Sequence, residues 1–324
     1  MRRKVETVVG MLLILILLQL AISTSTQATQ ISQQITNTQK IVVDQNGNGD
    51  YTSIQDAIDD AKEGSTIYVK AGKYCEIVEI KKQISLIGED KDYTLINPIS
   101  AKNKYAICLG APGVMLKGFG ITNGASGLYS SGIRITSSGV NVYDCKIFDN
   151  PVGIVIWTSD NKIENCIFYG CKDEGIALIG SSYSECQNNQ INNCKFYDNC
   201  DGIELQYASA NTISNCEIYS NSHTGIDAIA SSNNLNKISD CKIYDNEVNG
   251  IYLSSSSDNQ IIDCSLYDND DGDIIENKNS KNNQVISKNK KSLSNLKEAL
   301  FSFINRFSNL KNGKFSDIFE SLNF

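Results

Sequence analysis

The chain has 324 residues, a net charge of −8 and only three prolines. Its central part contains no block of lysine or arginine, so nucleic acid is excluded as the expected partner. Eleven cysteines are an odd number, and disulfides within the chain would leave at least one unpaired.

The N-terminus has the three-part pattern of an export signal. Basic residues at positions 2–4 precede an apolar run over residues 8–22, and small residues follow. The apolar run is short for a membrane span, so residues 1–28 are predicted to be a cleaved signal peptide. An uncleaved segment that attaches the protein to a membrane is the alternative. Both interpretations place the rest of the chain outside the cytoplasm, with residues 29–40 as a polar linker.

A short helix is predicted next. Ile54, Ala57, Ile58 and Ala61 are spaced as one face of a helix, and Ser53 precedes them as an N-cap. Such a helix would cover the open end of a solenoid, which needs a terminal cap. Alternating apolar segments then predict the first strands, at residues 66–69, 72–74, 77–80 and 84–88.

One pattern recurs about seven times from residue 132 to residue 285. Each unit contains Gly-Ile-x-(Ile/Leu/Val), a Ser/Asn-rich turn, Asn-x-Ile-x-(Asn/Asp)-Cys-x-(Ile/Phe/Leu)-(Tyr/Phe), and Asp-Asn or a close variant. The glycines stand at positions 132, 153, 175, 202, 225, 250 and 272. A period of roughly 23 residues, with short strands and no helix between them, predicts a parallel β-solenoid of about eleven rungs.

Alternation within the repeat assigns side chains to the inside of the coil. Like residues on successive rungs, about 4.8 Å apart, form ladders. The predicted ladders are Cys145, Cys166, Cys194, Cys216, Cys241 and Cys264 with Phe119 one coil earlier; Ile147, Phe168, Phe196, Ile218, Ile243 and Leu266; and a stack of turn asparagines, Asn150, Asn199, Asn221, Asn246 and Asn269.

The ladder cysteines are expected to be free thiols. Rung spacing is wider than the roughly 3.8 Å between the Cβ atoms of a disulfide. Cys171 and Cys200 occupy similar turns on adjacent coils, and a bridge between these two stays open.

Three segments ahead of the repeats carry a family resemblance. Residues 49–58 are Gly-Asp-Tyr-Thr-Ser-Ile-Gln-Asp-Ala-Ile, residues 68–74 are Tyr-Val-Lys-Ala-Gly-Lys-Tyr, and residues 85–89 are Ser-Leu-Ile-Gly-Glu. They resemble the opening of pectin-lyase-like right-handed β-helices, especially pectin methylesterases and NosD-type, carbohydrate-binding and sugar-hydrolase-like repeat proteins. The later repeats resemble NosD-type and parallel β-helix repeats. The resemblance implies an all-β, single-stranded right-handed parallel β-helix over residues 41–287.

A second amphipathic pattern of leucine, isoleucine and phenylalanine occupies residues 288–324. We expect a helical cap that closes the C-terminal end of the coil. A helix that docks to a protein or a membrane surface is the alternative.

The catalytic segments of the family's esterases do not occur. The resemblance to methylesterases would require an Asp-Phe-Ile-Phe-Gly-like and a Gly-Arg-Pro-Trp-like segment, and neither is present. Pectate lyases need a basic proton abstractor beside calcium-binding carboxylates, and Arg134 is the only arginine between residues 4 and 305. Esterase and lyase activities are therefore disfavoured.

Carboxylates gather instead on one outward face of the predicted coil. Glu204 and Asp227 fall on adjacent rungs, with Glu174, Asp201 and His223 beside them. A protonated and an ionised carboxyl can flank a glycosidic bond, which makes Asp201, Glu204 and Asp227 the candidate catalytic residues. Their oxygens would also suit Ca²⁺. Turn formation by aspartate before glycine is the structural alternative.

Two of these segments have a further resemblance. Asn-Cys-Asp-Gly at residues 199–202 and Ser-His-Thr-Gly at residues 222–225 resemble the Asn-Thr-Asp-Gly and Gly-His-Gly segments of polygalacturonase-type hydrolases. The Asp-Asp pair and the Arg-Ile-Lys segment of that family have no counterpart here.

Aromatic residues three positions after the ladder cysteines are predicted to form an outward column, of which Phe148 is the first. Aromatic rings can bind sugars through their apolar faces. The candidate carbohydrate-binding residues are Trp157, Tyr169, Tyr197, Tyr219, Tyr244, Tyr252 and Tyr267. Shielding of the neighbouring backbone is the alternative role.

No cofactor and no metal-ligand set are predicted, with Ca²⁺ as the one ion left open. NosD-type proteins are linked to copper delivery, but the chain beyond residue 28 has one histidine and one methionine, and its ladder thiols face inward. The sequence favours a secreted or cell-surface protein that binds or scaffolds polysaccharide, a cell-envelope glycan, over an enzyme. A polysaccharide hydrolase or lyase and a structural, adhesin-like envelope protein are the alternatives.

Overall fold

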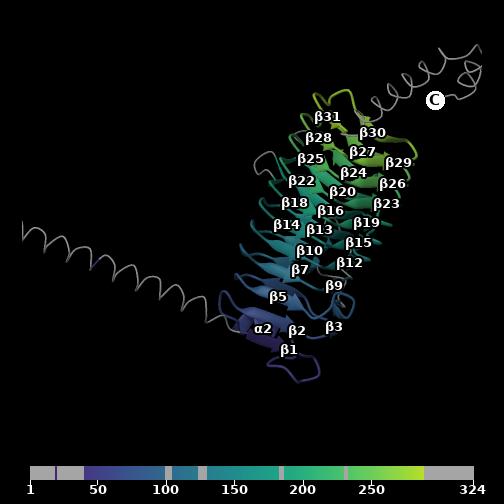
Figure 1. Ribbon diagram of the computed structural model, residues 1–324. Coiled ribbons are helices and arrows are strands. Elements are labelled where there is room, and N and C mark those ends of the chain that lie inside the picture. Colours follow the sequence, from purple (N-terminus) through teal and green to yellow (C-terminus); the bar gives the residue numbers. More distant parts are fainter. Residues whose placement is uncertain are drawn as a thin grey trace, which may run out of the picture.

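The computed structural model describes residues 40–98, 104–122, 130–181, 186–229 and 233–287, together with residue 19. Over these residues the chain winds as a right-handed parallel β-helix, and each turn adds one strand to each of three sheets (Figure 1). The predicted fold class is thereby confirmed. The predicted signal peptide, the linker up to residue 39 and the C-terminal cap lie outside the described residues.

The three long sheets run along the axis of the coil. Sheet A consists of β1 (Lys40–Val43), β2 (Thr66–Val69), β5 (Ser85–Gly88), β8 (Met115–Lys117), β11 (Asn141–Tyr143), β14 (Lys162–Glu164), β18 (Gln190–Asn192), β22 (Thr212–Ser214), β25 (Lys237–Ser239), β28 (Gln260–Ile262) and β31 (Gln284–Ile286). Sheet B consists of β3 (Gly72–Tyr74), β6 (Thr94–Ile96), β9 (Gly120–Ile121), β12 (Lys146–Phe148), β15 (Ile167–Tyr169), β19 (Lys195–Tyr197), β23 (Glu217–Tyr219), β26 (Lys242–Tyr244) and β29 (Ser265–Tyr267). Sheet C consists of β4 (Val78–Ile80), β7 (Tyr105–Leu109), β10 (Ser131–Ile135), β13 (Val152–Ile156), β16 (Glu174–Ile179), β20 (Asp201–Gln206), β24 (Ile226–Ile229), β27 (Asn249–Leu253) and β30 (Gly272–Glu276). The remaining pair, β17 (Cys186–Gln187) with β21 (Ala208–Ser209), lies in the connections from sheet C to sheet A.

Left-handed backbone conformations at asparagine and aspartate make the corner between sheets A and B. These two side chains tolerate that conformation better than other residues with a Cβ atom. The corner residues have φ between 50° and 59°, and they are Asp144, Asn165, Asn193, Asn215, Asp240 and Asp263. Each precedes a cysteine of the repeat, so the Asn/Asp-Cys dipeptide encodes both the turn and the return to the interior.

The interior ladders lie where the repeat predicts them. Cys145 to Cys241 of the cysteine ladder are at most 2% exposed, while Cys264 near the C-terminal end is partly exposed. Phe168 and Phe196 of the neighbouring ladder stack with ring centroids 4.7 Å apart. All cysteines are free, as expected for the ladder. The bridge between Cys171 and Cys200 that the sequence left open is therefore absent.

Asparagine stacks line two corners of the coil. In the predicted stack, Asn199 donates to Asn221, Asn221 to Asn246 and Asn246 to Asn269, over 2.8–3.1 Å. On the rung between Asn150 and Asn199 the position is occupied by Cys171, so the stack does not reach Asn150. The Asn150 amide donates to backbone carbonyls instead. A second stack, which the sequence analysis missed, connects sheets C and A through Asn161, Asn189, Asn211, Asn236, Asn259 and Asn283.

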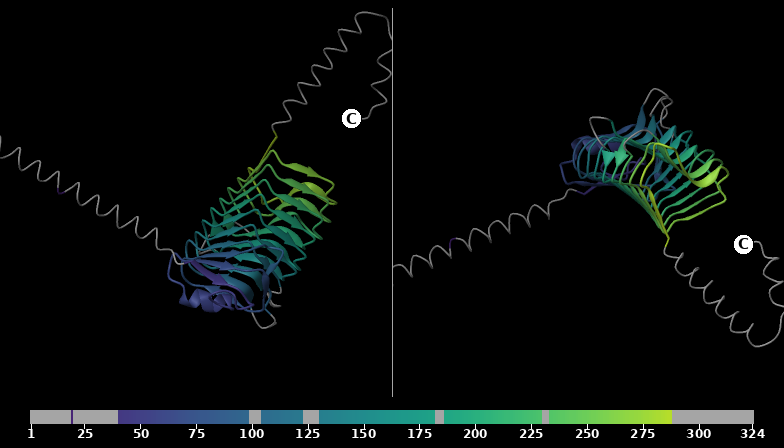
Figure 2. Two further views of the ribbon diagram at one scale, coloured as in Figure 1. Left: turned by 60° about the horizontal axis from the view of Figure 1, so that its bottom comes forward. Right: turned by 90° about the horizontal axis from the view of Figure 1, so that it is seen from above.

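The helix α2 (Ile54–Asp60) occupies the predicted position at the N-terminal end of the coil (Figure 2). The Ser53 hydroxyl accepts from the Asp56 backbone N–H at 3.2 Å, which is the predicted N-cap. Ile54, Ala57 and Ile58 are buried, and the helix contacts β1, β2 and β4. None of the helices in the described part of the chain is long and apolar enough to span a membrane.

Sheets B and C differ on their outer faces. Outward side chains of sheet B are mostly half-buried or exposed, and burial alternates along each strand. On sheet C the outward residues from β13 to β24 are buried as well, so that β13 and β16 are buried over their whole length. Polar groups on this second face are therefore withdrawn from water.

Candidate functional site

The predicted catalytic residues converge on the outer face of sheet C. Asp201 begins β20 and Glu204 follows on the same strand, while Asp227 pairs with Glu204 from β24. Glu174, at the start of β16, pairs with Asp201 on the preceding rung. The four side chains, which we call the carboxyl cluster, are only 5–9% exposed although they lie on an outward face.

Asp201 is held by the turn that precedes the next strand. Its Oδ1 accepts from the Thr224 backbone N–H at 2.7 Å and faces His223 Nδ1 at 2.8 Å. His223 itself is about half exposed. The Ser-His-Thr-Gly turn thus brings the imidazole and a backbone donor onto the same carboxylate oxygen, which fixes its orientation.

Glu174 and Glu204 form a close carboxyl pair. Burial raises the pKa of Glu174 to about 10, and the neighbouring Glu204 carboxyl contributes to the rise. Burial also raises the pKa of Glu204, although its hydrogen bond with Glu174 opposes the rise. Two neighbouring carboxylates that are both charged are unfavourable away from water. Burial and the neighbouring carboxyl therefore both favour the protonated form of Glu174.

Asp227 is the fourth member of the cluster, and one oxygen of its carboxylate lacks a hydrogen-bond partner in the described part of the chain. Burial raises its pKa to about 7, Asp201 and Glu204 add to the rise, and His223 opposes it. Its Oδ1 is buried and has no hydrogen-bond partner among the described residues. Glu174 Oε2 and Thr224 Oγ1 are buried without such a partner too. Buried polar atoms are normally hydrogen-bonded, so these three indicate a site that receives a ligand or solvent.

Apolar and aromatic side chains flank the carboxyl cluster on the same face. Toward the N-terminal end, Val155 and Ala177 pair across β13 and β16 and are fully buried. The partly buried Trp157 packs against this patch, and its ring lies 4.8 Å from the Arg134 guanidinium carbon. Toward the C-terminal end, Tyr252 pairs with Asp227. Sheet C thus offers rings on both sides of the carboxyls.

The tyrosines of sheet B form one continuous stack. Neighbouring ring centroids lie 5.0–5.3 Å apart from Phe148 through Tyr169, Tyr197, Tyr219 and Tyr244 to Tyr267. Each inner ring is covered on both faces by its neighbours. A sugar could therefore meet only ring edges and hydroxyl groups along the column, and a free ring face at its ends.

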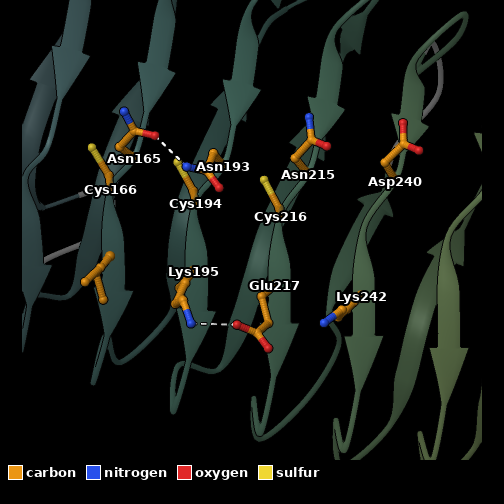
Figure 3. Close-up of a pocket in the computed structure, with 11 residues that line it drawn as sticks. Asn165, Cys166, Asn193, Cys194, Lys195, Asn215, Cys216, Glu217, Asp240 and Lys242 are labelled. Carbon is orange, nitrogen blue, oxygen red and sulfur yellow. Dashed lines mark hydrogen bonds and ion pairs between the residues drawn. The ribbon is translucent and has the colours of Figure 1, made fainter.

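A groove of about 410 Å³ lies at the corner between sheets A and B (Figure 3). Cys166, Cys194 and Cys216 line it but are nearly buried. Along its wall Asn193 donates to Asn165 at 2.6 Å, and Lys195 forms an ion pair with Glu217 at 2.7 Å, both visible in Figure 3. None of the predicted site residues lines this groove. None of the described residues that line it has a buried side-chain nitrogen or oxygen without a hydrogen-bond partner, so nothing there indicates a ligand.

Three side chains of the site could hold a metal ion. Asp201, His223 and Asp227 each offer one ligand atom, and these atoms lie within 4.8 Å of one another. The sequence analysis placed His223 beside the carboxylates without assigning it as a ligand. Within the described residues, the thiols of the cysteine ladder do not form such a group.

Sequence reasoning found the carboxylates but missed part of their surroundings. The repeat register gave Asp201, Glu204 and Asp227 one shared face, and the structure brings them together. Tyr105, whose ring lies 5.0 Å from Arg134, was missed because β7 precedes the regular repeats. The burial of the cluster was missed as well, because alternation predicts direction and not exposure.

Comparison with known proteins identifies the architecture. Residues 41–200 and 131–293 match the family model described as right handed beta helix region. No curated protein sequence matches the chain. Tailspike protein 2 from Escherichia coli O157:H7 bacteriophage CAB120 is similar in structure, with a TM-score of 0.60, 14% identity and coverage of 78% of this chain and 39% of that chain.

Two further solved structures, named as a pectin methylesterase and a pectate lyase, are also similar in fold. Pectin methylesterase from carrot has a TM-score of 0.41 and 16% identity, covering 76% of this chain and 82% of that chain. Pectate lyase Pel9A has a TM-score of 0.48 and 16% identity, covering 76% of this chain and 70% of that chain. At these identities the likeness concerns the fold. Because the family match spans most of the sequence, the chain belongs to the family of proteins with a right-handed β-helix region.

Proposed function

We propose that the protein binds a polysaccharide across the outer face of sheet C and cleaves a glycosidic bond at the carboxyl cluster. The observation that carries this proposal is geometric. Four carboxyls from three adjacent rungs meet on an outward face, and Glu174 Oε2 and Asp227 Oδ1 are buried there without partners. Buried side-chain oxygens are normally hydrogen-bonded, so these two support a face that receives a ligand.

The chemistry of the cluster suits acid and base catalysis. Glycoside hydrolysis needs one carboxyl that donates a proton to the leaving oxygen and one carboxylate on the other side of the bond. Glu204, whose pKa is raised by burial and which can take a proton from the neighbouring Glu174, is the proposed donor. Asp201, fixed by two hydrogen bonds to Oδ1, is the proposed carboxylate.

The neighbouring rings supply a way to position the sugar chain. Tyr252 is one rung beyond Asp227, which corresponds to about 4.8 Å along the axis. Trp157 follows β13, two rungs before β20. A chain that lies along the axis would contact a ring on each side of the carboxyls, since aromatic faces favour the apolar faces of sugars.

The proposed substrate implies a location outside the cytoplasm. The signal-like pattern of residues 1–28 supports secretion or attachment at the cell surface. The structural neighbours include proteins named as a pectin methylesterase, a pectate lyase and a phage tailspike. A cell-envelope or extracellular glycan is therefore the proposed partner.

The test is a product assay with acidic and neutral polysaccharides. Wild-type protein is expected to release reducing ends from at least one of them, and Glu204→Gln is expected to lower the rate by about 100-fold or more. Asp271→Asn is the matched control, because Asp271 also precedes a glycine of sheet C but is exposed. No product from any polysaccharide, or equal loss in both variants, would refute the hydrolytic role.

Binding without cleavage along sheet B is the second candidate. It rests on the regular stack of aromatic rings, whose centroids lie 5.0–5.3 Å apart. Retention of the protein on a glycan array is expected to fall for Tyr197→Ala and Tyr219→Ala while Glu204→Gln keeps it. Retention that depends on Trp157 and Tyr252 instead would assign binding to sheet C.

A further inference from the structure

We propose that Asp201, His223 and Asp227 bind a divalent transition-metal ion such as Mn²⁺ or Zn²⁺ on the outer face of sheet C. One ligand atom of each residue lies within 4.8 Å of the others. In metal sites with nitrogen and oxygen ligands at about 2.0–2.2 Å, ligand atoms stand roughly 3–4 Å apart. A small rotation of the His223 side chain, which is about half exposed, would close the site.

The backbone holds the two aspartates in place. Asp201 starts β20 and Asp227 lies within β24, so both belong to a parallel sheet rather than to a loop. The Thr224 backbone N–H donates to Asp201 Oδ1 at 2.7 Å. Ligands held by such secondary contacts bind a metal with less reorganisation. His223 is the adjustable member of the set.

Asp227 gives the independent indication of a ligand. It is only 6% exposed, and its Oδ1 has no hydrogen-bond partner among the described residues. A buried carboxylate oxygen is costly to leave unpaired. A cation placed between Asp227 and Asp201 would pair with this oxygen and offset the repulsion between the two side chains, which lie beside Glu204 as well.

The imidazole of His223 favours a transition-metal ion over Ca²⁺. Ca²⁺ prefers six to eight oxygen ligands, whereas this set offers two carboxylates and one nitrogen. Imidazole suits Zn²⁺ and its neighbours among the transition metals, and carboxylates suit Mn²⁺. His223 Nδ1 already points at Asp201 Oδ1 over 2.8 Å, so a metal would replace the proton shared between them. Three protein ligands leave positions open for water or a sugar hydroxyl.

Mn²⁺ is the best first probe because the chain carries competing thiols. Cys75 is exposed and Cys200, next to Asp201, is partly exposed. Thiolates select soft metals and hold Mn²⁺ poorly. Titration of the EDTA-treated full chain with Mn²⁺, followed by electron paramagnetic resonance, is expected to give one bound ion per chain. A Zn²⁺ titration on Cys200→Ser then separates thiol binding from binding at the proposed site.

Three variants test the ligand assignment without any polysaccharide. His223→Ala and Asp227→Asn are each expected to weaken Mn²⁺ binding by about tenfold or more. Asp271→Asn, which removes an exposed aspartate of the same sheet, is expected to leave it unchanged. His223→Ala changes a partly exposed side chain, and unchanged circular dichroism would show that it folds.

Several outcomes would overturn the proposal. Absence of Mn²⁺ and Zn²⁺ binding would do so. Binding that all three substitutions weaken to the same extent would also do so, because it would indicate attraction by surface charge. Ca²⁺ binding that survives His223→Ala would replace the transition-metal site by an oxygen site. Since no sugar is present, these results do not depend on whether the protein cleaves a polysaccharide.

Discussion

The outer faces of sheets B and C belong to the same coil but differ in how side chains on adjacent rungs interact. On sheet B, stacked residues satisfy one another: tyrosine lies on tyrosine, and Lys195 pairs with Glu217. On sheet C, stacking places Glu174 beside Asp201 and Glu204 beside Asp227, all buried. A parallel coil brings like positions together on every rung. Complementary or aromatic residues then stabilise the coil, while neighbouring carboxyls are held close together away from water.

The two faces should differ in the sign of the change in unfolding free energy that a substitution causes. Removing a group from sheet B or from the ladders beneath it should lower the free energy of unfolding, because its partners lose a contact. Removing the Glu174 carboxyl from sheet C should raise the free energy of unfolding, because burial and the neighbouring Glu204 both disfavour its charge. The following changes test this contrast in order of expected size.

Phe196→Ala should have the largest effect. Phe196 is fully buried under sheet B and stacks on Phe168 at 4.7 Å, so its removal leaves a cavity. A loss of about 3–5 kcal/mol in the free energy of unfolding is expected from urea denaturation. Phe148→Ala, on the half-buried outer face of the same sheet, is the control and should cost about 1 kcal/mol. Equal losses would mean that the interior is loosely packed.

Asn221→Ala should cost about 1–3 kcal/mol, because it leaves buried groups of the asparagine stack unpaired. Asn221 accepts from Asn199 at 3.1 Å and donates to Asn246 at 2.9 Å. The exposed Asn215, whose amide donates to Asn192, is the control, and Asn215→Gly, which keeps a residue that accepts its φ of 54°, should change stability by less than about 0.5 kcal/mol. Thermal unfolding of the two variants measures the difference. A small cost for Asn221→Ala would show that water replaces the stack.

The repeat made most of the architecture predictable. Gly-Ile-x-(Ile/Leu/Val) predicted the strands of sheet C, and Asn/Asp-Cys predicted the corner and the cysteine ladder. Five of the six asparagines between sheets C and A begin the Asn-x-Ile-x-(Asn/Asp)-Cys segment at a fixed distance before the cysteine, so the repeat carried a signal for this stack that the sequence analysis missed. The interrupted stack at Cys171 followed from a substitution that pattern matching treats as a minor variant.

The site was predictable in part. Register placed Asp201, Glu204 and Asp227 on one face, since parallel pairing conserves position from rung to rung. Period-two alternation says only which side of a strand a residue faces. Whether that side is open to water depends on the whole sheet, so the burial of the carboxyls and the orphaned Asp227 oxygen could come only from the structure. The mutual coverage of the tyrosine rings also depends on side-chain geometry.

Glu174→Gln should raise the free energy of unfolding by about 1–2 kcal/mol at neutral pH, with EDTA present. The folded-state pKa of Glu174 is raised to about 10, chiefly by burial. The folded wild type therefore binds more protons than the unfolded chain above the ordinary glutamate pKa, and its stability falls as pH rises through that window. Glutamine removes this dependence because its side chain does not titrate. The gain should widen from about pH 5 to about pH 8.

The control for Glu174→Gln is its exposed neighbour on the same turn, Asp173. Asp173→Asn should change stability by less than about 0.5 kcal/mol at either pH. Denaturant midpoints measured for both variants separate local burial from a general loss of negative charge. A Glu174→Gln variant that is less stable than the wild type at about pH 8 would contradict this prediction.

Glu217→Gln should have the smallest effect and the opposite sign. Glu217 loses its ion pair with Lys195 at 2.7 Å and its role as acceptor for the Tyr244 hydroxyl at 3.2 Å weakens. Because the pair is near the surface, the loss should stay below about 1 kcal/mol. The hydrogen bond from Lys195 lowers the pKa of Glu217, so its contribution is present above the ordinary glutamate pKa and disappears as pH falls through the folded value. Stability measured against pH should thus converge for wild type and variant in acid, whereas for Glu174→Gln it diverges toward alkali. Curves that move in the same direction would mean that the two faces do not differ in how they hold charge.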